Sequence, residues 1–158
     1  MNLLRHILQS GLEGSRFIIR MRNNFETNSY LGIEYEYDKN AADLGKLLYS
    51  KRFLNAYSSS DREYLVLQLF YCILQGVKTL HRLKIIHRDI KPENILCNQE
   101  FLSMKLIDFG FAKIFQSRDH VEKCSYVGTP AYMAPEVLTQ SRANVFKADI
   151  YALGIVLY

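Results

Sequence analysis

One short loop of this sequence carries three polar groups of different chemistry. Residues 87–94 read His-Arg-Asp-Ile-Lys-Pro-Glu-Asn, which places a carboxylate, an amine and a carboxamide within six residues. Pro92 keeps this segment from forming a helix, because proline has no backbone N–H to donate. A second carboxylate, Asp108, follows nineteen residues after Asp89. Together these groups can accept a proton, neutralise an anion and bind a hard cation through oxygen. The alternative is that both aspartates only cap turns.

Four motifs follow one another in the order found in a single enzyme family. They are His-Arg-Asp-x-x-x-x-Asn at residues 87–94, Asp-Phe-Gly at 108–110, Ala-Pro-Glu at 134–136 and Asp-x-x-x-x-Gly at 149–154. The sequence therefore resembles the eukaryotic protein kinases, with Tyr151 where that family usually has tryptophan. A lysine two residues after the catalytic aspartate, here Lys91, resembles the pattern of the serine/threonine kinases rather than that of the tyrosine kinases. Residues 108–113 and 147–158 resemble both the autophagy-initiating and the calcium/calmodulin-type kinases, which leaves the subfamily open.

This resemblance implies transfer of the γ-phosphoryl group of ATP to a serine or threonine hydroxyl of a protein substrate. Asp89 is then the catalytic residue that accepts the hydroxyl proton and holds that oxygen in line with the phosphorus. Lys91 neutralises charge on the transferred group, since a loose transition state depends on positioning and charge neutralisation. Asn94 and Asp108 are expected to hold Mg²⁺ between the phosphates, because hard oxygen donors suit that ion. ATP and Mg²⁺ are the implied cofactors.

The resemblance also implies a nucleotide-binding hinge. Residues 30–37 form the strand that leads into it, and Ile33 occupies the position that gates the back pocket. The backbone groups of Glu34 and Glu36 are expected to meet the adenine edge, and Leu96 to lie under the ring. These residues extend the predicted cofactor site from the catalytic loop to the other end of the chain.

Control by phosphorylation is implied by Arg88, which directly precedes the catalytic aspartate. A phosphate on the activation loop adds about −1.5 to −2 charges and can dock bidentately on an arginine. By resemblance, Ser125 is the residue that carries this phosphate, through an upstream kinase or autophosphorylation, and Lys113 is a second contact. Ser125 as an unmodified loop serine stays open. Thr129 matches the threonine that hydrogen-bonds the catalytic aspartate.

The four histidines have no metal-ligand spacing, and none is predicted to act as a base. His87 is expected to be a structural residue that packs near Phe109. His6, His81 and His120 are interpreted as incidental, because none has a carboxylate or a further ligand at a useful spacing.

The elements that must position these residues follow from hydrophobic spacing. Helices are predicted at residues 2–9, 44–49, 61–83 and 144–158, strands at 17–22, 30–37, 85–86, 95–97 and 105–107, a turn at 23–29 and a long surface loop at 116–128. Ser60 and Glu63 are expected to form a capping box for the helix at 61–83. The predicted fold class is α+β, protein-kinase-like and incomplete. Residues 1–37 would be a remnant of the N-lobe sheet with the hinge strand, and residues 38–158 the first part of a mainly helical C-lobe.

The composition is that of an ordinary globular domain. The 158 residues include 20 Lys+Arg and 16 Asp+Glu, a net charge of +4, and are 49% apolar, which excludes disordered and collagen-like chains. Without a basic run this charge indicates no nucleic-acid partner. Cys72, Cys97 and Cys124 include no Cys-x-x-Cys pair, so they are predicted to be reduced thiols of a cytoplasmic protein. No apolar stretch is long enough to span a membrane, and no secretory signal is recognised.

Two elements that kinases use to hold the phosphates of ATP are missing from the sequence. Gly11 and Gly14 do not match Gly-x-Gly-x-x-Gly, and no lysine precedes Lys39, so the phosphate-binding lysine is absent. The sequence is therefore interpreted as an incomplete piece of a serine/threonine kinase. The alternatives are a noncatalytic, pseudokinase-like binding or regulatory module, and a chain with weak unaided catalysis.

Overall fold

The computed structural model describes residues 3–50, 58–98 and 104–158. Its helices are α1 (Leu3–Gln9), α2 (Leu44–Tyr49), α4 (Ser59–Arg82), α5 (Pro135–Leu138) and α6 (Phe146–Leu157). Its strands are β1 (Met21–Glu26), β2 (Leu31–Tyr35), β3 (Ala41–Asp43), β4 (Ile85–Ile86), β5 (Ile95–Asn98), β6 (Met104–Leu106), β7 (Lys113–Ile114), β8 (Val121–Lys123) and β9 (Arg142–Asn144). Short 3-10 turns lie at Glu13–Phe17, Pro92–Asn94 and Pro130–Tyr132. The predicted α+β class is confirmed, and Asn2 of the predicted first helix lies outside the described residues.

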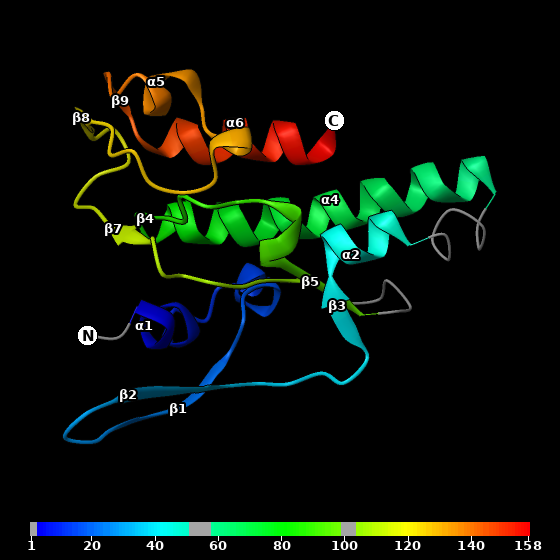
Figure 1. The fold of residues 1–158 in the computed structure, drawn as a ribbon, viewed down its shortest axis with the longest axis horizontal. Coiled ribbons are helices and arrows are strands. Elements are labelled where there is room, and N and C mark those ends of the chain that lie inside the picture. The colour runs from blue at the N-terminus through cyan, green and yellow to red at the C-terminus, as the bar shows by residue number, and fades with distance from the viewer. Residues whose placement is uncertain (1–2, 51–57, 99–103) are drawn as a thin grey trace.

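Helix α4 forms the centre of the molecule, with α6 on one side and α1 and the β1–β2 hairpin on the other (Figure 1). It begins after Ser58, whose hydroxyl accepts a hydrogen bond from the Asp61 N–H at 3.2 Å and donates one to the Asp61 carboxylate at 2.6 Å. The predicted capping box of Ser60 and Glu63 is therefore wrong. A run of three serines offers a cap two residues earlier, and the Asp61 carboxylate accepts from the hydroxyl of that same cap, Ser58.

One face of α4 is buried in the hydrophobic core. Ile73, Val77 and Leu80 lie on this face and are at most 3% exposed. Burial of each such side chain stabilises the fold by about 1.5–3 kcal/mol. The same cluster includes buried residues from α1, β6 and α6, so α4 joins both halves of the chain. The core therefore fixes the end of α4 from which β4 and the catalytic loop start.

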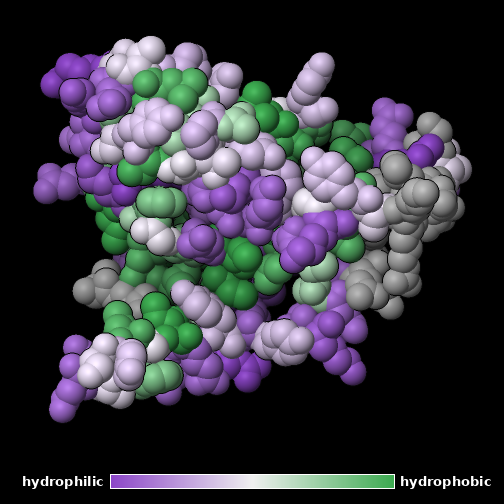
Figure 2. Space-filling model, viewed as in Figure 1, coloured by the Kyte–Doolittle hydropathy of each residue, from purple (hydrophilic) through white to green (hydrophobic). Residues whose placement is uncertain are grey.

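The hairpin near the N-terminus differs from the predicted one. Strand β1 starts at Met21 and continues to Glu26, so it includes residues 23–26, which were predicted as turn. Asn23, Asn24 and Glu26 pair antiparallel with β2, as does Phe25 between them. The turn is confined to residues 27–30, where the Thr27 N–H donates to the Tyr30 carbonyl at 2.8 Å. Both strands expose most of their side chains, so polar residues are tolerated in the ladder. The hairpin lies at the lower edge of the surface in Figure 2, which is hydrophilic over much of this face.

Small antiparallel sheets surround the catalytic loop. The sheet with strand order β3-β5-β6 contains β5, which directly follows the catalytic loop. Strand β4, which precedes the loop, pairs with β7. The predicted surface loop at residues 116–128 is partly wrong, because Val121–Lys123 form β8 and pair with β9. That partner lies about twenty residues later, and local spacing carries no signal of it. The predicted strands near residues 85, 95 and 105 are confirmed.

The three cysteines are free in the structure, as predicted. Cys97 and Cys124 are buried, and burial raises the pKa of Cys97 to about 12. Among the described residues, no helix is long and apolar enough to cross a membrane.

Candidate active site

The catalytic loop is held by a buried carboxylate from α6. Asp149 is 2% exposed and accepts hydrogen bonds from the His87 N–H and the Arg88 N–H, each at 2.9 Å. Arg88 has φ 70°, a left-handed conformation that costs a non-glycine residue about 1–3 kcal/mol. The two hydrogen bonds to Asp149 offset this cost and direct the loop toward Asp89. The motif at residues 149–154 thus supports the loop from a distance of about sixty residues in sequence.

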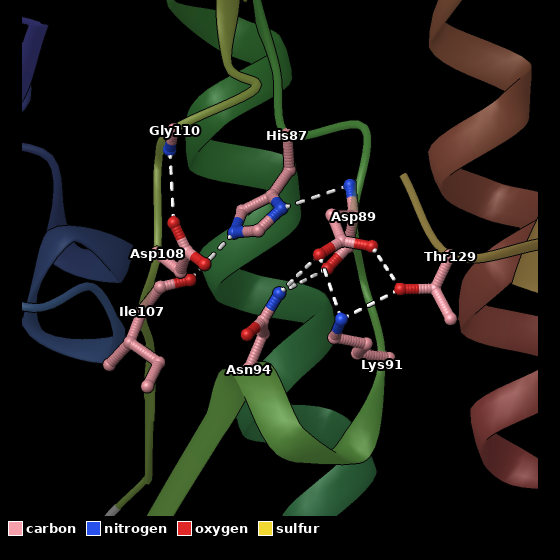
Figure 3. Close-up of polar contacts among 8 residues, drawn as sticks. All are labelled: His87, Asp89, Lys91, Asn94, Ile107, Asp108, Gly110 and Thr129. Atoms are coloured by element: carbon pink, nitrogen blue, oxygen red, sulfur yellow. Dashed lines mark hydrogen bonds and ion pairs between the residues drawn. The ribbon is translucent and has the colours of Figure 1, made fainter. Parts of the chain in front are cut away.

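Asp89 is the centre of the polar network in Figure 3. Its carboxylate accepts hydrogen bonds from the Thr129 hydroxyl at 2.8 Å and from the Asn94 Nδ2 at 2.8 Å, and pairs with the Lys91 Nζ at 3.1 Å. Lys91 also donates to the Thr129 hydroxyl at 2.7 Å. The structure therefore brings together Asp89, Lys91, Asn94 and Thr129, all four of which were predicted from the motifs. The predicted contact between Thr129 and Asp89 is present.

Asp89 is ionised despite being 6% exposed. Burial alone would raise the pKa of its carboxyl group, but hydrogen bonds from Thr129, Lys91 and Asn94 outweigh that effect and lower the pKa below its ordinary value. A fixed carboxylate at this position can orient a hydroxyl and accept its proton. The network thus prepares Asp89 for its predicted role.

Gly128 allows the close approach of Thr129 to the catalytic loop. It has φ 107°, and a Cβ at this position would lie 2.3 Å from the Arg88 carbonyl oxygen. Any other residue at this position would push Thr129 away from Asp89.

His87 is fully buried and structural, as predicted. Its ring lies 4.9 Å from that of Phe109, and burial lowers the pKa of the imidazole below its ordinary value, so the ring is neutral. The Nε2 lies 3.0 Å from the Ile107 carbonyl, and the Asp89 N–H donates to Nδ1 at 3.3 Å. A neutral ring satisfies both contacts when Nε2 carries the proton. His87 therefore links the catalytic loop to the strand before Asp108.

Asn94 and Asp108 fit the predicted magnesium site. Both hydrogen bonds of the Asn94 Nδ2 go to Asp89, and among the described residues the Asn94 Oδ1 accepts none. Asp108 is exposed, with φ 58°, and one carboxylate oxygen accepts from the Gly110 N–H at 3.1 Å while the other has no partner among the described residues. An amide oxygen and a carboxylate are a donor set that suits Mg²⁺ with phosphates completing its coordination. Figure 3 shows both side chains on the same side of the loop.

The predicted hinge residues lie at the end of the hairpin and on β5. Ile33 is 40% exposed on β2, and Leu96 is half-buried on β5 and packs against the core. The Glu36 N–H donates to the Arg20 carbonyl at 2.9 Å, so this amide is engaged within the chain. Glu34 is exposed. Their roles toward adenine stay predictions.

One of the residues that were predicted to be regulatory, Lys113, contacts a carboxylate that the sequence did not suggest. Lys113 pairs with Glu122 at 2.8 Å, while Ser125 is exposed. The Arg88 Nε donates to the Phe111 carbonyl. Phosphorylation of Ser125 stays a prediction.

The interpretation of His81 as incidental is wrong. Its Nε2 lies 2.9 Å from the Asp149 carboxylate, which therefore has contacts with α4 as well as with the catalytic loop. His120 is also engaged, at 3.3 Å from Glu122. The His81 contact spans 68 residues, so no spacing rule identifies it. The position of His81 in the last turn of α4, beside the start of the loop, is the only local signal.

Comparison with known proteins agrees with the motifs. The profile of the protein kinase domain matches residues 5–158. The chain is 39% identical over 144 residues to the serine/threonine-protein kinase SRK2F of Arabidopsis thaliana, covering 89% of this chain and 38% of that protein. It is 34% identical over 158 residues to SRK2J of the same plant, covering 99% and 44%, and 35% identical over 145 residues to human cGMP-dependent protein kinase 2, covering 91% and 17%.

The chain thus spans less than half the length of these relatives. Its relatives also include a probable myosin light chain kinase of Dictyostelium discoideum and human Nek5, so they do not confirm either suggested subfamily. The α+β fold, the match over residues 5–158 and the Asp89 network agree. The chain belongs to the protein kinase family and is, by family, a protein serine/threonine kinase.

Proposed function

We propose that this chain carries the phosphoryl-transfer centre of a serine/threonine kinase that acts on a hydroxyl of a protein substrate. The observation that carries this proposal is the Asp89 carboxylate held by Thr129, Lys91 and Asn94 at 2.8–3.1 Å. This network is formed without a substrate, so the base, Asp89, is oriented before a substrate binds. Preorganised charge is a large contributor to enzyme rates.

Each residue then has one task. Asp89 orients the substrate hydroxyl and accepts its proton, and Lys91, anchored on Asp89 and Thr129, neutralises the transferred group. Asn94 and Asp108 hold Mg²⁺ through the oxygens described above. When bound, ATP would supply the phosphoryl group and Mg²⁺ would neutralise its charge. Residues 1–37, with Ile33, Glu34 and Glu36, together with Leu96 would form the adenine side of the site, and residues 38–158 the catalytic side.

Thermal unfolding of the 158-residue chain with and without Mg²⁺-ATP tests nucleotide binding. We expect Mg²⁺-ATP to raise the melting temperature of the wild-type chain, because a ligand that binds only the folded state stabilises it. Asp108→Ala should abolish this increase, whereas Asp119→Ala, a change at an exposed aspartate outside the site, should retain it. No increase in the wild-type chain would contradict the proposed site.

Transfer to a generic protein substrate is measured with radiolabelled ATP. Loss of the base in Asp89→Asn should reduce transfer by about 10²–10⁴-fold, the usual contribution of general acid–base catalysis. Equal transfer by both chains would exclude the proposed role of Asp89.

A noncatalytic binding or regulatory module is the second candidate function. One observation favours it: the Glu36 N–H, which was expected to meet the adenine edge, donates to the Arg20 carbonyl at 2.9 Å. This candidate predicts nucleotide-dependent stabilisation or none, but in either case no transfer above that of Asp89→Asn. The transfer assay therefore separates the two functions.

A further inference from the structure

Glu122 pairs with Lys113, the lysine that was predicted to contact a phosphate on Ser125. Its carboxylate oxygens lie 2.8 Å and 3.1 Å from the Lys113 Nζ, and one of them lies 3.3 Å from the His120 Nε2. Hydrogen bonding by Lys113 lowers the pKa of Glu122 below its ordinary value, so the carboxylate is ionised. Lys113 was the predicted second contact of a phosphate on Ser125, and it already has an anionic partner.

Glu122 also faces the catalytic loop. It lines one cavity together with Arg88, Ser125 and Asp89. Burial lowers the pKa of the Arg88 guanidinium, while the Glu122 carboxylate acts in the opposite direction and favours its charged form. The negative charge of Glu122 therefore pairs directly with Lys113 and lines the same cavity as Arg88, the other cation that was predicted to bind the phosphate.

The backbone fixes this carboxylate in position. Glu122 is the central residue of β8 and lies opposite Ala143 of β9, whereas Lys113 on β7 lies opposite Ile86 of β4. The Glu122–Lys113 pair therefore connects the β8–β9 sheet to the β4–β7 sheet, from which the catalytic loop departs. The buried Phe115 ring supports the pair: the Lys113 Nζ lies 4.7 Å from its centroid and the His120 ring 4.9 Å.

We propose that Glu122 is a positioning residue whose unmodified carboxylate holds the loop at residues 116–128 on Lys113, as a phosphate on Ser125 would. This regulation rests on the proposed function of the site. Because the Glu122–Lys113 contact exists in the unmodified chain, it orders the loop at residues 116–128 before any phosphorylation. A phosphate on Ser125 would then compete with Glu122 for Lys113.

Hydrogen exchange in the unphosphorylated 158-residue chain tests this contact. The reporter is the Cys124 amide, which donates to the Ser141 carbonyl at 3.0 Å beside β8, and the reference is the amide of Ile85, a fully buried residue. We expect Glu122→Gln to accelerate exchange at Cys124 about three- to tenfold, the effect of losing a partly exposed charge-assisted pair, with Ile85 unchanged. Asp119→Asn removes an exposed carboxylate of the same segment and should change nothing.

Charge reversal separates an electrostatic role from a structural one. Lys113→Glu should accelerate exchange at Cys124 as Glu122→Gln does, and the double change Lys113→Glu with Glu122→Lys should restore protection. The proposal is wrong if Glu122→Gln exchanges like the wild type, if Asp119→Asn has an equal effect, or if the reversed pair gives no protection. The measurement needs neither ATP nor turnover, so it can succeed even where the nucleotide-binding test fails.

Discussion

Thr129 connects the two charged side chains of the catalytic loop. Its hydroxyl donates to Asp89 at 2.8 Å and accepts from Lys91 at 2.7 Å, so one oxygen orders both the base and the cation. Since Asp89 is buried, a lost donor is not fully replaced by water. The residue acts on the site through Asp89 and not by reaching the reacting atoms itself.

We therefore expect Thr129→Val, which keeps the shape of the side chain but removes the hydroxyl, to destabilise the fold by about 1–3 kcal/mol. The pKa of Asp89 should rise at the same time, because one of the hydrogen bonds that lower it is gone. Urea unfolding measures the first effect, and NMR titration of the Asp89 carboxyl carbon the second. Thr129→Ser keeps the hydroxyl and should resemble the wild type. An Asp89 pKa in Thr129→Val equal to that in the wild type would disprove the link.

At the scale of elements, Asp149 joins α6 to α4 and to the catalytic loop. The carboxylate accepts from the His87 and Arg88 amides and lies 2.9 Å from His81. Burial alone would raise the pKa of Asp149, but these partners, chiefly His81, outweigh it and lower the pKa. The end of α4, the catalytic loop that follows it and the distant helix α6 thus depend on one charge.

The pH dependence of this contact follows from the sign of the shift. A carboxyl group whose pKa is lower in the folded chain than in the unfolded chain stabilises the fold fully above the unfolded value, about 3.9, and loses this contribution as the pH falls through the folded value. We expect Asp149→Asn to cost about 3 kcal/mol or more from pH 7 to pH 5, because a charged acceptor of two buried amides is lost.

Below about pH 4 the difference between the wild type and Asp149→Asn should shrink, because the wild-type carboxyl is protonated first in the unfolded chain and, at lower pH, in the folded chain as well. Urea unfolding at several pH values measures this difference, with the exposed Asp119→Asn as the control. A difference that stays constant down to pH 3 would show that the charge of Asp149 is not the stabilising factor.

Local patterns predicted the elements whose causes are local. The spacing of Ile73, Val77 and Leu80 predicted α4, and the four motifs placed Asp89 and Thr129 in one site. Elements that depend on distant partners were missed, such as β8, which exists through pairing with β9. The His81–Asp149 and Lys113–Glu122 contacts were missed for the same reason, since neither residue in a pair determines the other's position in sequence.

For the molecule as a whole, the relevant feature is that α6 leaves some of its apolar side chains exposed. The helix buries Phe146, Ala152 and Leu153, yet leaves Ile150 51% and Leu157 46% exposed. The last two residues are seven positions apart and lie on one face of the helix. Exposed apolar side chains that share one helix face can favour association between copies of a chain.

We expect the wild-type chain to associate reversibly as its concentration rises, and the double change Ile150→Lys with Leu157→Lys to shift it toward the monomer. Because both side chains are already exposed, the free energy of unfolding should change by no more than about 0.5 kcal/mol per substitution. Sedimentation velocity over a range of concentrations measures the association. The control places the same charges on α4, as Tyr64→Lys with Leu67→Lys, at residues 64% and 57% exposed. An equal shift in both variants would attribute the effect to net charge, whereas a larger shift in the α6 variant identifies this helix as the associating surface.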